Sequence, residues 1–246
     1  RCMAGWLGRL FHRKKDEPLR CTAVVAAAGS SARMEGQDKL LLLLGEQPVL
    51  VHALRALELC PYITEIVIVT REDRIVPVGQ LCRDYAFSKV SKVIVGGDTR
   101  TASVLAGVRE AEEGASLIAV HDGARPLVSQ SVLEQVILRA RECGAAAPAV
   151  PVKDTLKQAK DGVVTATPDR ASLYAVQTPQ VFEAALIRTA LTKALEEGAS
   201  LTDDCSAVER LGVGVALTRG DYRNIKITTP EDLAIGEALF EWSESQ

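Results

Sequence analysis

Aromatic side chains are scarce in this chain, and long uninterrupted apolar runs are missing. Phe, Trp and Tyr make up 4% of the 246 residues, which leaves few rings on which single-stranded bases could stack. The formal net charge is −3, so the sequence lacks the basic excess of a nucleic-acid-binding domain. No stretch reaches the roughly 18 consecutive apolar residues that predict a transmembrane helix. We therefore expect no nucleic-acid partner and no membrane span.

The six cysteines form no Cys-x-x-Cys pair. Scattered thiols argue against a zinc ribbon or a disulfide framework and are typical of reduced cysteines in a cytoplasmic protein. Cys205 stands in the run Thr202-Asp203-Asp204-Cys205-Ser206, but no His or Lys lies beside it to activate a thiolate. We therefore predict a cytoplasmic protein and interpret Cys205 as an ordinary small residue.

The first twenty residues differ in character from the rest. A short apolar stretch, residues 3–11, is followed by the basic run His12-Arg13-Lys14-Lys15. A secretory signal carries its positive charge before the apolar region, so we do not expect one here. A weak membrane-surface helix is one alternative for this segment. We expect instead an N-terminal extension over residues 1–20, disordered or weakly helical and without membrane contact, followed by one domain over residues 21–246.

From residue 21 onward, apolar runs alternate with segments of helical periodicity. We expect strands at residues 21–28, 65–70, 92–95, 117–121 and 145–152 and helices at residues 48–60, 74–85, 101–113 and 131–143. Uninterrupted apolar strands separated by helices favour a mostly parallel sheet with helices on both faces. The sequence therefore predicts a single Rossmann-like α/β domain, whose ligands bind at the carboxyl ends of the strands.

After residue 152 the alternation stops. Residues 153–181 contain no long helical pattern, but β-like runs flank Lys160-Asp161-Gly162, and an Asp-Gly step favours a hairpin. A segment of this length is too long for an ordinary loop. We predict a protruding β-arm at about residues 153–181 that reaches across the surface or across a partner subunit. Further elements are expected as helices at 183–197 and 204–211, strands at 213–218 and 224–228, and a last helix beginning at Thr229-Pro230.

Small residues follow the first predicted strand. The run Ala-Ala-Ala-Gly at residues 26–29 lets a ligand approach the backbone, whose N–H groups can bind phosphate oxygens. Arg33 and Lys39 add the positive charge that a triphosphate needs. The spacing matches neither the P-loop nor the dinucleotide-binding glycine pattern. The loop therefore predicts a nucleotide site of another kind, with a plain strand-to-helix turn as the alternative.

Polar residues also follow two other predicted strands. Gly96-Gly97-Asp98-Thr99-Arg100 comes after one of them, and His121-Asp122-Gly123-Ala124-Arg125 ends another. Because parallel strands end at one edge of a sheet, we expect these groups to converge there. Helix capping is an equally open interpretation of Asp98 and Thr99, and His121 is left without a role.

Seven motifs occur in the order typical of one enzyme family. They are AAAGSSARM, GGDTRTASV, HDGARP, VKDT, DRASLYAVQTPQ, TDD and NIKITTPEDL, and they extend from about residue 21 to residue 240. On these motifs the chain resembles the 2-C-methyl-D-erythritol 4-phosphate cytidylyltransferases of non-mevalonate isoprenoid biosynthesis. The resemblance implies transfer of a cytidylyl group from CTP to 2-C-methyl-D-erythritol 4-phosphate, with release of pyrophosphate and a requirement for Mg²⁺ or another divalent cation.

The resemblance also implies roles for single residues. The catalytic residues would be the cations Arg33, Lys39 and Lys226. The nucleotide-binding residues would be Ala27, Ala28, Gly29, Gly97, Asp98 and Ser103. The substrate-binding residues would be Asp122, Arg125, Thr155, Arg170, Thr178 and Thr202, with Asp122 also the candidate metal ligand. Since two of these residues lie in the predicted arm, the resemblance implies a homodimer in which exchanged arms complete each other's sites.

The sequence departs from the family pattern mainly in the opening loop. The loop is one residue shorter than expected between Met34 and Lys39, Asp38 replaces a proline, and Ser31 replaces a glycine. Two other functions stay open: a ribitol-5-phosphate cytidylyltransferase, and a non-catalytic nucleotide-binding module. The VKDT motif and the spacing of the DR and TPQ motifs favour methylerythritol phosphate. The presence of all three catalytic cations favours an enzyme.

Overall fold

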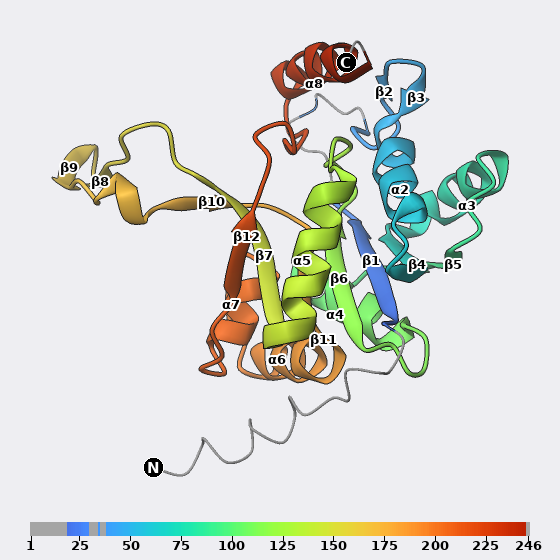
Figure 1. The fold of residues 1–246 in the computed structure, drawn as a ribbon, viewed down its shortest axis with the longest axis horizontal. Coiled ribbons are helices and arrows are strands. Elements are labelled where there is room, and N and C mark those ends of the chain that lie inside the picture. The colour runs from blue at the N-terminus through green and yellow to red at the C-terminus, as the bar shows by residue number, and fades with distance from the viewer. Residues whose placement is uncertain (1–18, 30–33, 35–37, 245–246) are drawn as a thin grey trace.

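The computed structural model describes residues 19–29, 34 and 38–244 (Figure 1). Of the predicted N-terminal extension, only Leu19 and Arg20 belong to this part of the chain. The prediction for residues 1–18 and the proposed position of Arg33 lie outside the described residues. Within the described residues, no helix combines the length and apolar character needed to cross a membrane.

A central sheet of eight strands organises the domain. Seven strands lie in the order β10-β7-β11-β6-β1-β4-β5, and β12 pairs with β7. The strands are β1 (Cys21–Ala27), β4 (Ile63–Thr70), β5 (Val90–Val95), β6 (Leu117–Asp122), β7 (Ala145–Pro151), β10 (Tyr174–Val176), β11 (Gln180–Glu183) and β12 (Ala216–Arg219). Strand β1 pairs in parallel with β4 and β6, β4 with β5, and β12 with β7, whereas β10 and β11 are antiparallel to their neighbours. The predicted mostly parallel sheet is confirmed.

Helices cover both faces of this sheet, as predicted (Figure 1). They are α2 (Val49–Leu59), α3 (Ile75–Asp84), α4 (Arg100–Glu110), α5 (Gln130–Cys143), α6 (Ala184–Glu196), α7 (Asp204–Glu209) and α8 (Pro230–Glu244). Alternate residues of β1 belong to different cores: Val25 packs with α2 and α5, and Val24 packs with α4 and α6. The uninterrupted apolar character of β1 therefore follows from burial on both faces.

Close packing of α4 on the sheet fixes the end of the loop at residues 96–99, which follows β5 and leads into this helix. A Cβ atom at Gly107 would lie 2.4 Å from Cγ1 of Val24 and 2.7 Å from Cγ2 of Val69. Only glycine therefore lets the helix approach the strands this closely. The helix begins at Arg100 because the Thr99 side chain accepts a hydrogen bond from the Ala102 N–H group.

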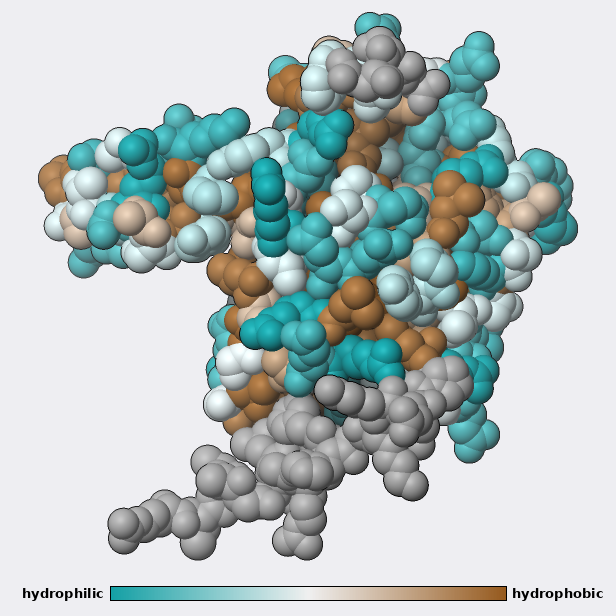
Figure 2. All heavy atoms as spheres, in the orientation of Figure 1, coloured by the Kyte–Doolittle hydropathy of each residue, from teal (hydrophilic) through white to brown (hydrophobic). Residues whose placement is uncertain are grey.

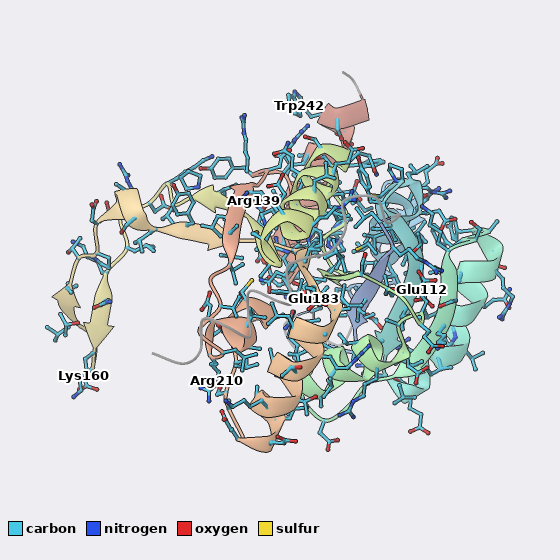
Figure 3. The ribbon with its side chains drawn as sticks, turned by 60° about the horizontal axis from the view of Figure 1, so that its bottom comes forward. Glu112, Arg139, Lys160, Glu183, Arg210 and Trp242 are labelled. Atoms are coloured by element: carbon cyan, nitrogen blue, oxygen red, sulfur yellow. The ribbon has the colours of Figure 1, made fainter. Side chains whose placement is uncertain are left out.

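The predicted arm contains the expected hairpin. Strands β8 (Gln158–Lys160) and β9 (Val163–Ala166) are antiparallel, and Asp161 and Gly162 make the turn with φ values of 51° and 79°. The hairpin projects from the body of the domain, with Lys160 at its far end (Figures 1 and 3). The chain returns through η2 (Arg170–Ser172) to β10.

Two expectations about the second half of the chain are corrected. Residues 224–228 do not form a strand. The N–H groups of Asn224 and Ile225 donate to nearby carbonyls of the same segment, and the N–H group of Ile227 donates to the Ala124 carbonyl in the loop after β6. The expected strand is therefore wrong: the segment bonds to the loops after β6 and before β11 instead of pairing along the sheet. Conversely, β10 and β11 were missed, because each is very short and Pro179 stands between them. A small hairpin of β2 (Leu43–Leu44) and β3 (Gln47–Pro48) also precedes α2.

Candidate active site

The carboxyl ends of β1, β5 and β6 lie at one edge of the sheet, where the sequence predicts a ligand site. Gly96, just after β5, donates a hydrogen bond from its N–H group to the Thr70 carbonyl at the end of β4. Gly123, just after β6, donates to the Ala26 carbonyl in β1. These two bonds hold the loops after the strands against the neighbouring strand ends.

The predicted nucleotide-binding residues of β1 and β5 are close neighbours at this edge. A Cβ atom at Gly96 would lie 2.6 Å from Oγ of Ser103 and 3.1 Å from Cβ of Ala28. A Cβ atom at Gly97 would lie 2.6 Å from Cβ of Ala102. The Ser103 hydroxyl donates to the Gly97 carbonyl over 3.1 Å. The loop is thus built from small residues around a buried serine, a surface that lets a flat ligand reach the backbone.

Asp122, the last residue of β6, is at the centre of a cluster of charges. Its Oδ2 atom lies 2.8 Å from Nζ of Lys226 and 3.7 Å from Nε of Arg125. Its Oδ1 atom lies 3.7 Å from Nη2 of Arg100. Burial alone would raise the pKa of the Asp122 carboxyl, but Lys226, Arg100 and Arg125 together hold this pKa below its ordinary value. Asp122 is therefore an anion surrounded by three cations.

His121 fixes the orientation of two predicted site residues. Its side chain is fully buried, and this burial lowers its pKa to about 4, so the ring is neutral near pH 7. Nε2 lies 3.2 Å from the Arg125 carbonyl, which can only accept, so Nε2 carries the proton. Nδ1 then accepts from the Thr178 hydroxyl at 3.1 Å, and that hydroxyl accepts from the Asp122 N–H group at 3.0 Å. Thr178 is therefore engaged with the backbone that carries Asp122.

The irregular segment after β12 brings Lys226 to Asp122. Asn224 is fully buried, and its carbonyl accepts a hydrogen bond of 2.6 Å from Nη1 of Arg125. Its Nδ2 group donates to the Thr178 carbonyl over 2.9 Å. Asn224 thus connects the Lys226 segment to the loop after β6 and to the loop before β11. Asn224 was assigned no role from the sequence, although it directly precedes Ile225-Lys226.

Arg100 and Asp204 form a second ion pair beside the Asp122 cluster. The guanidinium donates through Nη1 and Nη2 to the two oxygens of Asp204, at 3.0 and 2.7 Å. Asp204 is 1% exposed, and this burial raises its pKa although Arg100 opposes the shift. The Gln180 side chain accepts from the N–H groups of Asp204 and Cys205. Cys205 itself is buried, which raises its pKa and agrees with its interpretation as a packing residue.

The remaining predicted residues lie outside this cluster of contacts. Lys39 is half-buried and follows Asp38, whose carboxylate lies 3.1 Å from Nε of Arg74. Thr202 is exposed, two residues before α7. Thr155 and Arg170 are exposed in the arm, where Nη1 of Arg170 donates to the Lys153 carbonyl over 2.7 Å. The arm to which they belong projects from the sheet (Figure 1).

The fold and the charge cluster define a class: a doubly wound α/β protein with a cluster of charged side chains at the carboxyl ends of its parallel strands. A family model described as 2-C-methyl-D-erythritol 4-phosphate cytidylyltransferase matches residues 21–242. The enzyme of that name from Desulforamulus reducens is 46% identical over 224 residues, which cover 88% of this chain and 94% of the relative. The one from Geotalea uraniireducens is 42% identical over 236 residues, which cover 93% and 100%.

A solved structure agrees with these sequence relatives. The crystal structure of 4-diphosphocytidyl-2C-methyl-D-erythritol synthase from Anaerococcus prevotii superposes with a TM-score of 0.81 at 31% identity. The match covers 90% of this chain and 96% of that one. The chain belongs to the family of 2-C-methyl-D-erythritol 4-phosphate cytidylyltransferases.

Proposed function

We propose that this protein transfers a cytidylyl group from CTP to 2-C-methyl-D-erythritol 4-phosphate, giving 4-diphosphocytidyl-2-C-methyl-D-erythritol and pyrophosphate. The observation that carries the proposal is the Lys226–Asp122–Arg125 cluster beside the small-residue loop, in a chain of this family. A ribitol-5-phosphate cytidylyltransferase would share the chemistry, but the relatives compared above are named for the methylerythritol substrate. Release of pyrophosphate from CTP, with and without this acceptor, tests the proposal.

The reaction needs positive charge around the reacting phosphorus rather than covalent help from the protein. A phosphate oxygen of the acceptor attacks the α-phosphorus of CTP in line with the departing pyrophosphate. Arg125 and Lys226 both face the single carboxylate of Asp122, and Arg100 is neutralised by Asp204, so the cluster has a surplus of positive charge. Such a surplus attracts two anionic substrates and stabilises the negative charge that develops in the transition state.

Lys226 is the best supported catalytic residue. Its ammonium is a strong ion-pair partner of Asp122 at 2.8 Å, and its side chain is still 38% exposed at the edge of the site. It can therefore exchange part of this pairing for a phosphate oxygen without moving far. We assign Arg33 and Lys39 the same task from the opening loop on the strength of the family resemblance.

The nucleoside of CTP would bind where the chain has the smallest residues. Ala27, Ala28 and Gly29 approach from β1, and Gly97 and Asp98 approach from the loop after β5. The backbone groups of this surface can bind a pyrimidine edge because no large side chain covers them. Ser103 would contribute indirectly, because its hydroxyl donates to the Gly97 carbonyl and so holds this loop in place.

The acceptor would bind on the Asp122 side of the site. Asp122 and Arg125 offer a carboxylate for hydroxyl groups and a guanidinium for the phosphate. Thr178 would contribute mainly by orienting Asp122, since its hydroxyl already bonds to His121 and to the Asp122 N–H group. Thr202 would approach from the segment before α7.

The residues present fit a Mg²⁺ ion that is held largely by the substrate. Among the described residues, no group of three or more His, Cys, Asp or Glu side chains could hold a metal. Mg²⁺ often binds through one or two carboxylates together with substrate phosphates and water, and Asp122 can supply one such carboxylate. The ion would neutralise triphosphate charge when bound, while Lys226 and Arg125 act from the protein.

We also propose that the enzyme is a cytoplasmic homodimer in which the arms are exchanged. Apolar atoms lie among hydrophilic ones along the arm (Figure 2), and in β9 Val163 is 68% exposed and Val164 is 54% exposed. Burying them against a second copy would remove apolar surface from water. Thr155 and Arg170 would then reach the partner's site.

Mixing two inactive variants tests the exchange of arms. Arg170→Ala should lose turnover while CTP binding is kept, and Lys226→Ala should lose catalysis in its own site. In a mixed dimer, one of the two sites has both residues intact. The account therefore predicts that mixing restores activity to about a quarter of the native value, as expected for random assembly of two-fold dimers. Absence of any restoration would argue that Arg170 acts within its own chain, and an Arg170→Ala variant that is active before mixing would argue that Arg170 has no role.

A further inference from the structure

Arg100 lies between two carboxylates but binds only one of them fully. Its Nη2 atom is 2.7 Å from Oδ2 of Asp204 and 3.7 Å from Oδ1 of Asp122. The first distance is that of a charge-assisted hydrogen bond, and the second is too long for one. Arg100 therefore attracts Oδ1 of Asp122 electrostatically but forms no hydrogen bond with it. The other oxygen, Oδ2, is already paired with Lys226.

Asp204 is held firmly in the position from which it binds Arg100. Its backbone N–H group donates to Oε1 of Gln180 over 3.0 Å, and Nε2 of Gln180 donates to Oδ2 of Asp203 over 2.8 Å. Asp203 in turn caps α7 through a capping box with Ser206. The carboxylate is almost completely buried, so it has no solvent position to which it could move.

We propose that Asp204 is a positioning residue that holds Arg100 back from Asp122, so that Oδ1 of Asp122 stays open to the incoming substrate. This inference rests on the proposed function only for the identity of that substrate. Without the charge on Asp204, the nearest carboxylate for the guanidinium is Asp122, less than one bond length beyond hydrogen-bonding distance. Arg100 would then bind Oδ1 and compete with the substrate for Asp122.

The variant Asp204→Asn tests this competition by a distance and by kinetics. In its crystal structure, Nη2 of Arg100 should lie about 2.7–2.9 Å from Oδ1 of Asp122, the range of an N⁺–H···O⁻ bond. The value of kcat/KM for the acceptor should fall by about 10–100-fold, as is typical when a partner behind a site residue is lost. Binding of CTP alone, measured by calorimetry without metal, should be retained. An Arg100–Asp122 distance that stays at 3.7 Å would overturn the proposal.

A double variant separates restraint of Arg100 from simple support of the fold. Arg100→Gln combined with Asp204→Asn removes both charges, so no buried charge is left unpaired and no cation can move onto Asp122. The proposal predicts that the double variant has most of the native kcat/KM for the acceptor. This expectation holds whether or not the single variant Asp204→Asn folds. A double variant that is as impaired as Asp204→Asn would overturn the proposal, because the loss would then not depend on Arg100. If only the double variant folds, an impairment of more than about tenfold would overturn it, since the loss of a supporting partner would then persist without any cation free to move onto Asp122.

Two controls keep the outcomes distinct. Glu197→Gln removes the ion pair with Arg210 at the other end of α7 and should leave acceptor kinetics unchanged. If the native enzyme itself shows no turnover with methylerythritol phosphate, the proposed function is wrong. The role of Asp204 is still tested in that case by the Arg100–Asp122 distance in crystals of Asp204→Asn.

Discussion

Acid should destabilise the folded protein through His121, and the size of the effect follows from its burial. The folded pKa is about 4, whereas an unburied histidine has a value near 6.5. At pH values between about 4 and 6.5, the histidine is protonated in the unfolded chain but neutral in the folded chain, so the free energy of unfolding falls as the pH falls. At about 1.4 kcal/mol for each pH unit, the gap between the two pKa values corresponds to a loss of about 3 kcal/mol.

The variant His121→Gln isolates this contribution. Glutamine does not titrate, and its amide can still donate to the Arg125 carbonyl as Nε2 of His121 does. Urea unfolding at about pH 7 and about pH 4 should give a loss of stability that is about 3 kcal/mol larger for the native chain than for the variant. Carboxyl groups titrate in both proteins, so their effect cancels in the difference. An equal loss in the two proteins would refute the assignment of a buried, neutral His121.

Further predictions concern the charged and the small-residue sides of the site. Lys226→Met should lower kcat by about 100–1,000-fold, the usual cost of removing one group that stabilises transition-state charge, and should leave the far-UV circular dichroism spectrum unchanged. A smaller loss than tenfold would remove Lys226 from the catalytic residues. Gly97→Ala should weaken CTP binding by about tenfold, because the new methyl group meets Cβ of Ala102 at 2.6 Å and overpacking costs about 1–3 kcal/mol. Gly214→Ala, where a Cβ meets no atom within 4 Å, is the matched control, and equal CTP affinities in the two variants would contradict the account.

The location of the site follows from sequence because one rule of parallel sheets is strong. Ala27 and Asp122 end strands that are buried and apolar, and parallel strands with crossover helices present their carboxyl ends at one edge. The pattern that predicts the strands therefore also predicts the meeting place of the loops. The hairpin at Asp161-Gly162 was predictable for a similar local reason, since its turn residues adopt positive φ.

The connections between these loops were not predictable from sequence. Arg100 and Asp204 are 104 positions apart, and neither residue type nor spacing indicates that they pair. The same holds for Asn224, whose side chain bonds to the Thr178 carbonyl far away in the chain. Residues 224–228 were even expected to form a strand, but the backbone of this segment bonds locally and to the loop after β6 instead of to a neighbouring strand. Contacts of this kind depend on the assembled sheet.

Transfer of the cytidylyl group to the acceptor can be followed with a labelled substrate. The protein is incubated with CTP labelled at the α-phosphate, Mg²⁺, and either 2-C-methyl-D-erythritol 4-phosphate, ribitol 5-phosphate or no acceptor. The account predicts that the label appears in 4-diphosphocytidyl-2-C-methyl-D-erythritol with the first acceptor, far faster than in any product with the second, and that Lys226→Met abolishes most of this transfer. Label transferred preferentially to ribitol 5-phosphate, or to neither acceptor, would contradict it.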